Sequence, residues 1–123
     1  MAQDYDKEAE CFMQIGQIHE QQGDLDKAID QLNQFLEKCK KHDNNKKEGY
    51  AHKLLAEVHS KNGNTGKAID HLKEVMSIAT KYQNNSALAE ATLKLGLLYN
   101  KEGKERNIKQ AELVLKEHFD LLR

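Results

Sequence analysis

The chain has 123 residues, a length that fits a single domain. It lacks proline and tryptophan and has 6% aromatic and 32% charged residues, a composition that favours long helices over sheets. A formal net charge of −1 argues against nucleic acid and anionic lipid as partners, and two cysteines are too few for a disulfide framework or a structural zinc site. The polar, acidic start is unlike a signal peptide, and no run reaches the ~18 apolar residues of a membrane span, so we expect a soluble, cytoplasmic protein.

Six helices are predicted, at about residues 5–22, 25–42, 46–62, 65–83, 86–102 and 107–122. Gly23, Gly63 and Gly103 lie 40 residues apart, and each follows an amphipathic stretch of about 18 residues. A glycine at this place suits the left-handed position after a helix end, and Asp24 or Asn64 can then cap the next helix. Each pair of helices is therefore predicted to form a hairpin.

The helix at 5–22 is predicted to bury one face, because its apolar and small residues recur at i, i+3, i+4 and i+7. This stripe consists of Phe12, Ile15, Gly16, Ile18 and His19. Gly16 is expected to let the paired helix approach closely, and Ala28 would do the same from the helix at 25–42. Cys11 and Cys39 are expected to be small buried residues.

The second unit repeats the first without a gap when residues 9–48 are laid over 49–88. Lys27-Ala28-Ile29-Asp30 then matches Lys67-Ala68-Ile69-Asp70, and His19 matches His59. The second helices of the two units carry the same predicted buried face. Its residues are Ile29, Leu32, Phe35, Leu36 and Cys39 in the first unit, and Ile69, Leu72, Val75, Met76 and Ala79 in the second.

The third unit keeps this register in its first helix, where Ala91 and Leu95 match Ala51 and Leu55. The helix at 107–122 aligns only after a three-residue slip, and apolar residues surround most of it. Among these are Ile108, Val114, Phe119 and Leu121. A terminal helix needs a polar outer face, so we expect the chain to be a fragment or subunit whose end is covered by another repeat, a second copy or a neighbouring protein.

These features resemble the tetratricopeptide repeat. The residues that carry the resemblance are Ile15-Gly16, His19, Gly23 and Ala28 in the first unit, and Leu55-Ala56, His59, Gly63 and Ala68 in the second. The usual period of that family is about 34 residues, and the longer period of 40 is similar to the long-helix subclass of kinesin light chains and Pins-type polarity adaptors. The prediction is an all-α fold, a right-handed α-solenoid of three helical hairpins, as one domain over residues 1–123 with repeats at about 5–44, 45–84 and 85–123.

Four segments carry a closer resemblance. They are Glu8-Ala9-Glu10-Cys11, Gly49-Tyr50-Ala51, Lys67-Ala68-Ile69-Asp70-His71-Leu72-Lys73 and Leu95-Gly96-Leu97-Leu98-Tyr99-Asn100-Lys101-Glu102-Gly103. Over roughly residues 8–103 the chain resembles the repeat region of a ciliary family, the tetratricopeptide repeat protein 29 family. That family is associated with the axoneme and its dynein arms, so the resemblance implies a cilium or flagellum as the setting.

The resemblance also implies where a partner binds, because such solenoids bind through the concave wall that their first helices line. The lining positions are Glu10, Met13, Gln17 and Glu20, then Tyr50, Lys53, Glu57 and Lys61, then Glu90, Leu93, Leu97 and Lys101. The Lys and Asn donors that clamp a C-terminal carboxylate in chaperone-type grooves are not reproduced. Leu93 and Leu97 are expected to face outward, either as an anchor for a partner segment or as a packing site for another part of the same polypeptide.

Six histidines raise the question of a metal site. His19 and His59 share one repeat position, where we expect a ring packed between helices with one polar tip, and no Cys-x-x-Cys or His-Glu-x-x-His spacing is present. The sequence also lacks a Gly-x-Ser-x-Gly motif and a glycine-rich phosphate loop. We expect no metal, no cofactor, no small-molecule substrate and no catalytic residue.

The sequence therefore predicts a non-enzymatic scaffold that binds other proteins, which the resemblance would set in a ciliary axoneme among dynein-arm-associated proteins. The alternative is a soluble cytosolic adaptor that captures a helical or linear peptide motif in its concave groove. A chain that is monomeric and binds short peptides favours the adaptor. One that aggregates unless a large partner is co-expressed favours the scaffold.

Overall fold

The computed structural model describes residues 2–102 together with residues 109, 112–113, 116 and 120. It contains five α-helices, which are α1 (Ala2–Gln21), α2 (Leu25–Lys41), α3 (Asn45–Lys61), α4 (Thr65–Lys81) and α5 (Asn85–Glu102). Their bounds lie within a few residues of the predicted ones, and the described residues contain no strand. Most of the sixth helix predicted at 107–122 lies outside the described residues. Gly103, Ile108, Val114, Phe119 and Leu121 also lie outside them.

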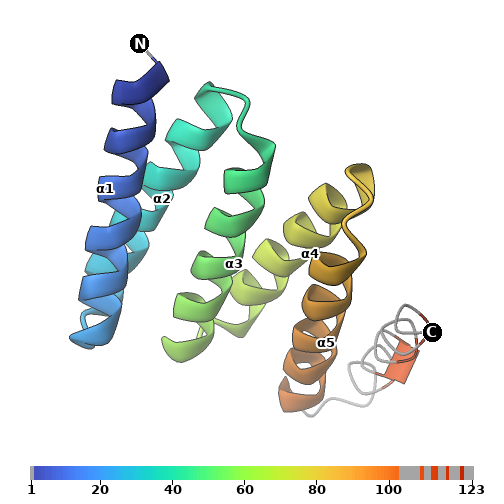
Figure 1. Cartoon of the computed structure of the whole chain (residues 1–123). Helices are drawn as coiled ribbons and strands as arrows, with labels where there is room; N and C mark the ends of the chain where they lie inside the picture. The colour runs from blue at the N-terminus through green and yellow to red at the C-terminus, as the bar shows by residue number, and fades with distance from the viewer. Residues whose placement is uncertain (1, 103–108, 110–111, 114–115, 117–119, 121–123) are drawn as a thin grey trace.

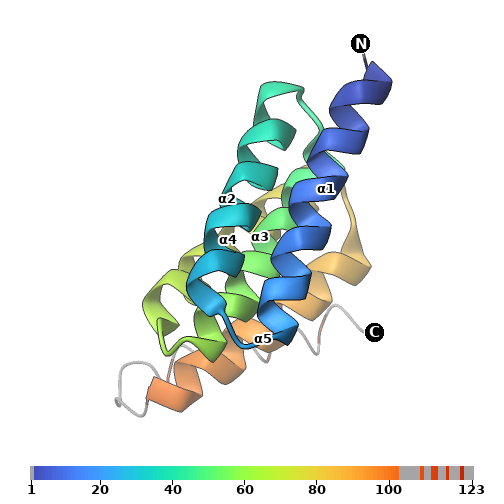
Figure 2. The same ribbon diagram turned by 90° about the vertical axis from the view of Figure 1, so that its left-hand side faces the viewer.

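Each helix packs against the next one along the chain, α1 on α2, α2 on α3, α3 on α4 and α4 on α5. In Figure 1, α1, α3 and α5 stand in a row with α2 and α4 behind them, and Figure 2 shows α1 and α2 together at the near end of the stack. The predicted all-helical solenoid is thus confirmed for the described residues. None of the helices in this part of the chain is both long and apolar enough to cross a membrane.

The four turns that join the five helices share one geometry. The residue at the same place in each has positive φ, 82° at Gly23, 54° at Asp43, 80° at Gly63 and 56° at Gln83. The following amide N–H then donates to the carbonyl five residues back, at 2.8–2.9 Å in all four turns. The left-handed glycines at 23 and 63 were predicted from their spacing, whereas the same turn built with Asp43 and Gln83 was not.

Side chains at the start of the next helix complete three of these turns. The side-chain oxygens of Asp24, Asn44 and Asn84 accept from the backbone N–H three residues on, at 3.3, 3.1 and 3.1 Å. Asn64 occupies the same place but makes no such hydrogen bond. The predicted cap is therefore confirmed at Asp24, and at Asn64 only its position is confirmed.

Replacing Gln83 by glycine is expected to stabilise the protein by about 0.5–1 kcal/mol. Left-handed backbone disfavours a residue with a Cβ by about 1–2 kcal/mol, and the greater conformational entropy of glycine in the unfolded chain offsets part of that gain. Urea denaturation measures the change. The matched control is Gly63→Gln in the preceding turn, where an added Cβ meets nothing within 4 Å, so that backbone strain alone acts. It should lose a similar amount, and a shift of both variants in one direction would contradict this reading of the turns.

The core lies along the buried faces of the second helices. Leu32, Phe35, Leu36 and Cys39 of α2 cluster with residues of α1 and α3, and Ile69 and Leu72 of α4 cluster with α3 and α5, as their stripes predicted. A Cβ built on Gly16 would lie 2.9 Å from Cγ of Leu32. Because real Cβ atoms do not approach that closely, the predicted role of Gly16 in the close packing of α1 on α2 is confirmed.

The predicted burial of Cys11, Ile15 and Ile18 is wrong. Cys11 is exposed, and Ile15 and Ile18 are 42% and 52% exposed. In the 40-residue register the isoleucines match Leu55 and Val58, which are fully buried. The difference arises because α2 covers this face of α3, whereas no described element covers the same face of α1.

Candidate partner-binding groove

A groove of about 700 Å³ opens between α3 and α5, with α4 as its floor. The first halves of α3 and α5 form the walls, and the second half of α4 lies between them. Leu72, Val75, Ile78 and Ala79 supply the floor, because the apolar stripe of α4 is wide enough to reach beyond its contact with α3. The result is an apolar trough on the side of the solenoid where the sequence predicted binding.

Two tyrosines line this trough and remain accessible. Tyr50 of α3 is 40% exposed, and Tyr82, just after α4, is 51% exposed. Tyrosine joins an apolar ring to a hydroxyl that stays hydrated, which is why it is enriched where proteins bind one another. Lys81 lies over the ring of Tyr82, with Nζ 5.5 Å from its centroid.

The charged residues of the wall bind each other. Nζ of Lys53 lies 3.0 Å from Oε1 of Glu90, and Nζ of Lys94 lies 3.2 Å from Glu90 and 3.1 Å from Glu57. The hydrogen bond from Lys53 lowers the pKa of Glu90, with Lys94 adding to it. Partial burial opposes the charge of Lys94, but its bonds to Glu57 and Glu90 outweigh this and raise its pKa. The four side chains form a network that ties α3 to α5 and stays ionised.

The part of the predicted wall on α1, together with Lys61 of α3, lies outside this groove. Met13 is partly buried against the core, Gln17 is half-buried and Glu10 is exposed. Nζ of Lys61 donates to Oε1 of Glu20 at 3.3 Å, which links α1 to α3. None of these five residues lines the groove.

Leu93 and Leu97 face outward on α5, as expected, and are 38% and 55% exposed. They lie outside the groove lining and extend the apolar surface of α5 beyond it. The side chain of Lys101 lies outside the described residues. Of the twelve lining positions predicted, the structure brings Tyr50, Lys53 and Glu90 into the groove, with Glu57 joined through Lys94.

Sequence reasoning missed the contribution of α4 and of Lys94. Only the first helices were assigned to the wall, so Val75 was taken as core and Tyr82 was not considered. Ile78 offered a signal, because it follows Val75 by three residues on an apolar helix. Lys94 offered another, since it lies one turn after Glu90.

A histidine cluster lies between α3 and α4. Nδ1 of His52 and Nδ1 of His71 are 2.9 Å apart, and the ring of His59 stacks on His71 with centroids 5.4 Å apart. Burial lowers the pKa of His52 and of His71 to about 4, and it lowers the pKa of His59 as well. The sequence had paired His19 with His59 by register and did not find this contact. Among the described residues, no group of three or more His, Cys, Asp or Glu is arranged to hold a metal ion.

Stacked helical hairpins with one repeated turn define a helical-repeat protein, a class that presents extended surfaces to other proteins. Residues 9–42 match the family model described as tetratricopeptide repeat. Nearly the whole chain is similar in structure to the TPR domain of Arabidopsis FLU, with a TM-score of 0.85 and 18% identity over 96% of this chain and 97% of that one. None of the curated proteins matches the chain. One repeat of this family therefore lies at residues 9–42, and nearly the whole chain shares the fold of a tetratricopeptide repeat domain.

Proposed function

We propose that this chain is a non-enzymatic scaffold that binds another protein through the groove between α3, α4 and α5. The observation that carries the proposal is the apolar trough over Val75 and Ile78 with the exposed ring of Tyr50 on its wall. A partner segment that fills an open apolar groove of this size removes apolar surface from water, and this favours binding.

The partner segment we propose presents apolar side chains to the trough rather than a carboxylate. Three lysines line the groove, and two of them, Lys53 and Lys94, are already held by Glu90 and Glu57. A ligand carboxylate that binds Lys53 or Lys94 would have to displace these carboxylates, whereas an aliphatic or aromatic side chain can enter the trough without breaking an ion pair. Leu93 and Leu97 provide a further apolar contact for a helix or extended segment that continues along α5.

For the cellular setting we propose a ciliary or flagellar axoneme, with dynein-arm-associated proteins as partners. This part rests on the sequence resemblance over roughly residues 8–103. The alternative is a cytosolic adaptor for short peptide motifs, for which the same apolar groove would be the binding site. Binding of isolated short peptides by a monomeric chain would select the adaptor. Retention in washed axonemes together with dynein-arm proteins would select the scaffold.

Replacing Tyr50 by glutamate is expected to weaken partner binding at least about tenfold, because loss of a central tyrosine commonly removes about 2 kcal/mol of binding energy. The measurement is affinity isolation from ciliated cells with quantitative mass spectrometry, comparing wild type with the variant. The matched control is Lys73→Glu, which also places a carboxylate on an exposed helix position, but outside the groove. A partner that binds wild type, Y50E and K73E equally does not use the groove.

The double change of Leu93 and Leu97 to glutamate tests the extension along α5. It should weaken the same partner while leaving thermal unfolding within about 0.5 kcal/mol of wild type, as for other exposed positions. Unfolding of this variant would instead show that the two leucines belong to the core of the intact protein.

A further inference from the structure

The lysines of the groove are unevenly neutralised. Lys46, Lys53 and Lys94 line it, and among the described residues of the lining Glu90 is the only carboxylate. Glu90 and Glu57 hold Lys53 and Lys94 at 3.0–3.2 Å. Lys46 is exposed and makes no ion pair with any residue that the structure describes. The groove therefore carries positive charge that its own carboxylates leave uncompensated.

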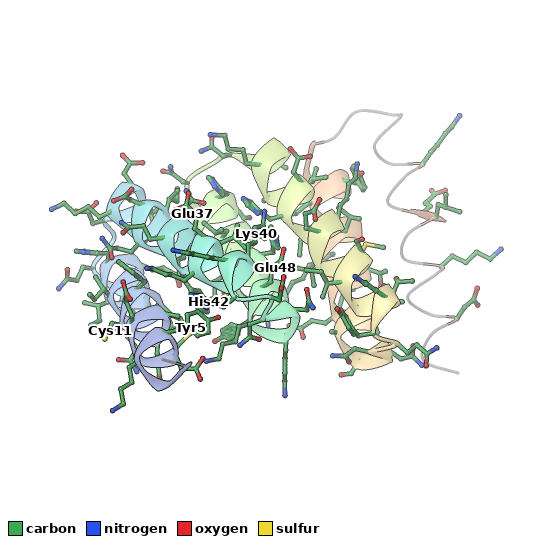
Figure 3. All side chains as sticks on the ribbon, turned by 90° about the horizontal axis from the view of Figure 1, so that it is seen from above. Tyr5, Cys11, Glu37, Lys40, His42 and Glu48 are labelled. Atoms are coloured by element: carbon green, nitrogen blue, oxygen red, sulfur yellow. The ribbon has the colours of Figure 1, made fainter. Side chains whose placement is uncertain are left out.

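This free charge lies at one end of the groove. Lys46 belongs to the first turn of α3, and Lys53 follows it by two helical turns, about 10 Å along the axis. Lys81, the last residue of α4, lies at the same end, over the ring of the lining residue Tyr82, and it too makes no ion pair within the described part of the chain. We call Lys46 and Lys81 the basic end of the groove. In Figure 1 the α2–α3 and α4–α5 turns both lie at the top, and Figure 3 looks onto this end of the molecule.

The carboxylates closest to Lys46 in the sequence do not neutralise the basic end. Glu48, labelled in Figure 3, lies outside the groove lining, and its Oε1 is 3.9 Å from Nε2 of the buried His52. Asp43, in the α2–α3 turn, is also outside the lining. Of the three helices that form the groove, α3 and α5 begin at this end and only α4 ends there, so their dipoles add positive potential. An anionic group is attracted to this place.

We infer that the partner segment carries an acidic side chain, Asp or Glu, that binds at the basic end while its apolar side chains fill the trough. This rests on the groove function proposed above and adds the charge of the segment and the end at which that charge lies. A carboxylate beside Lys46 completes an ion pair without displacing Glu90 or Glu57. A basic segment would instead be repelled, and a polyanion such as nucleic acid would leave the apolar floor of Val75 and Ile78 unfilled.

The geometry of α3 also sets the spacing within the segment. Tyr50 follows Lys46 by one turn, about 6 Å along the axis. A carboxylate at Lys46 and an apolar side chain against Tyr50 are therefore about 6 Å apart in the partner. In an extended segment this is the distance between residues about two positions apart, and in a helix between residues about four positions apart. The segment thus combines an acidic and an apolar residue at one of these two spacings.

The experiment selects from a library of random peptides of about 12 residues, long enough to span the groove as a helix or as an extended segment. Selections on the whole wild-type chain and on Lys46→Glu run in parallel at about 0.01 M salt, where the Debye length is about 30 Å. Peptides that lose affinity for Tyr50→Ala are kept as groove binders, since this change alters the wall without altering the charge. On wild type they should be enriched in Asp and Glu over the unselected library, at the two spacings given above. On Lys46→Glu this enrichment should disappear.

Affinities measured for one selected peptide test the contact directly. By fluorescence anisotropy, Lys46→Glu should bind the peptide at least about fivefold more weakly than wild type, because an attraction becomes a repulsion, and Lys46→Gln should show a smaller loss. The matched control, Lys73→Glu, reverses the charge of an exposed lysine outside the groove and should bind as wild type does. When the acidic residue of the peptide is replaced by lysine, Lys46→Glu should become the tighter binder.

Two results would overturn the inference while the groove proposal stands. One is a set of Tyr50-dependent peptides with no excess of Asp and Glu. The other is a Tyr50-dependent acidic peptide that binds wild type and Lys46→Glu equally at low salt. If no selected peptide depends on Tyr50, the groove proposal itself fails and this inference fails with it, so the two failures are distinguishable.

Discussion

Replacing Ala68 by phenylalanine is expected to lower the free energy of unfolding by about 3 kcal/mol or more, the upper end of what overpacking costs. Ala68 is fully buried in α4. Ala68 holds the place in α4 that Ala28 has in α2. The carbonyl oxygen of Ala28 lies 3.4 Å from a Cβ built on Gly16. With helices this close, a phenyl ring has no space unless α3 and α4 separate, and separation would expose the Ile69 and Leu72 cluster.

The matched control for this prediction is Lys73→Phe, which adds the same ring to the exposed side of α4. It should change the free energy of unfolding by no more than about 0.5 kcal/mol. Urea denaturation of both variants, with the m-value checked for two-state behaviour, provides the comparison. If Ala68→Phe unfolds near the wild-type midpoint, α3 and α4 do not pack closely at Ala68, and the repeat register is wrong.

The repeat could be predicted from sequence because its determinants are local. Gly23 and Gly63 mark turns by a backbone preference of glycine itself, and Gly16 and Ala28 mark a helix crossing by size alone. Asp43 and Gln83 form the same turn without that signature, so their left-handed conformation is enforced by the two helices that each turn connects. Periodicity still located those turns, because it does not depend on the turn residue.

Burial and the groove were harder to predict, since both depend on which neighbour is present. Ile15 and Leu55 have the same helical spacing and the same apolar character, yet among the helices that the structure describes, one packs over Leu55 and none over Ile15. In the groove, Val75 belongs to the apolar stripe that fills the core and also lines an open trough. A stripe in the sequence does not say how much of its width the neighbouring helix covers.

Acidification from pH 7.5 to 4 is expected to destabilise the hairpin of α3 and α4. One histidine of its cluster contributes about 3 kcal/mol to this loss, because each unit of pKa shift corresponds to about 1.4 kcal/mol. The pKa of His52 and of His71 is about 4 in the folded protein, against 6.5 for an unperturbed ring. The unfolded chain therefore takes up protons near pH 6.5, whereas the folded chain does so only near pH 4. Stability is full above pH 6.5, falls through this window and levels off below it.

The surroundings of the cluster set the size of this effect. Desolvation is the main reason that the charged forms are disfavoured, and Lys40 adds to it at His52. Asp70 and Glu74 favour a charge on His71 but do not outweigh its burial and the two neighbouring rings. Nε2 of His52 lies 3.9 Å from Oε1 of Glu48, too far for a hydrogen bond to hold a proton there.

His71→Gln separates titration from packing, because the glutamine amide can still donate to Nδ1 of His52 but does not titrate between pH 4 and 7.5. At pH 7.5 the variant should melt close to wild type, and between pH 7.5 and 4.5 it should lose less stability than wild type, since one of the three histidines with a lowered pKa is gone. Proton NMR titration of wild type gives an independent reading, with ring resonances of His52 and His71 that stay in the neutral form down to about pH 5. Ring signals that titrate near pH 6.5 would mean that water reaches both rings, and the acid sensitivity of the hairpin would then have to arise elsewhere.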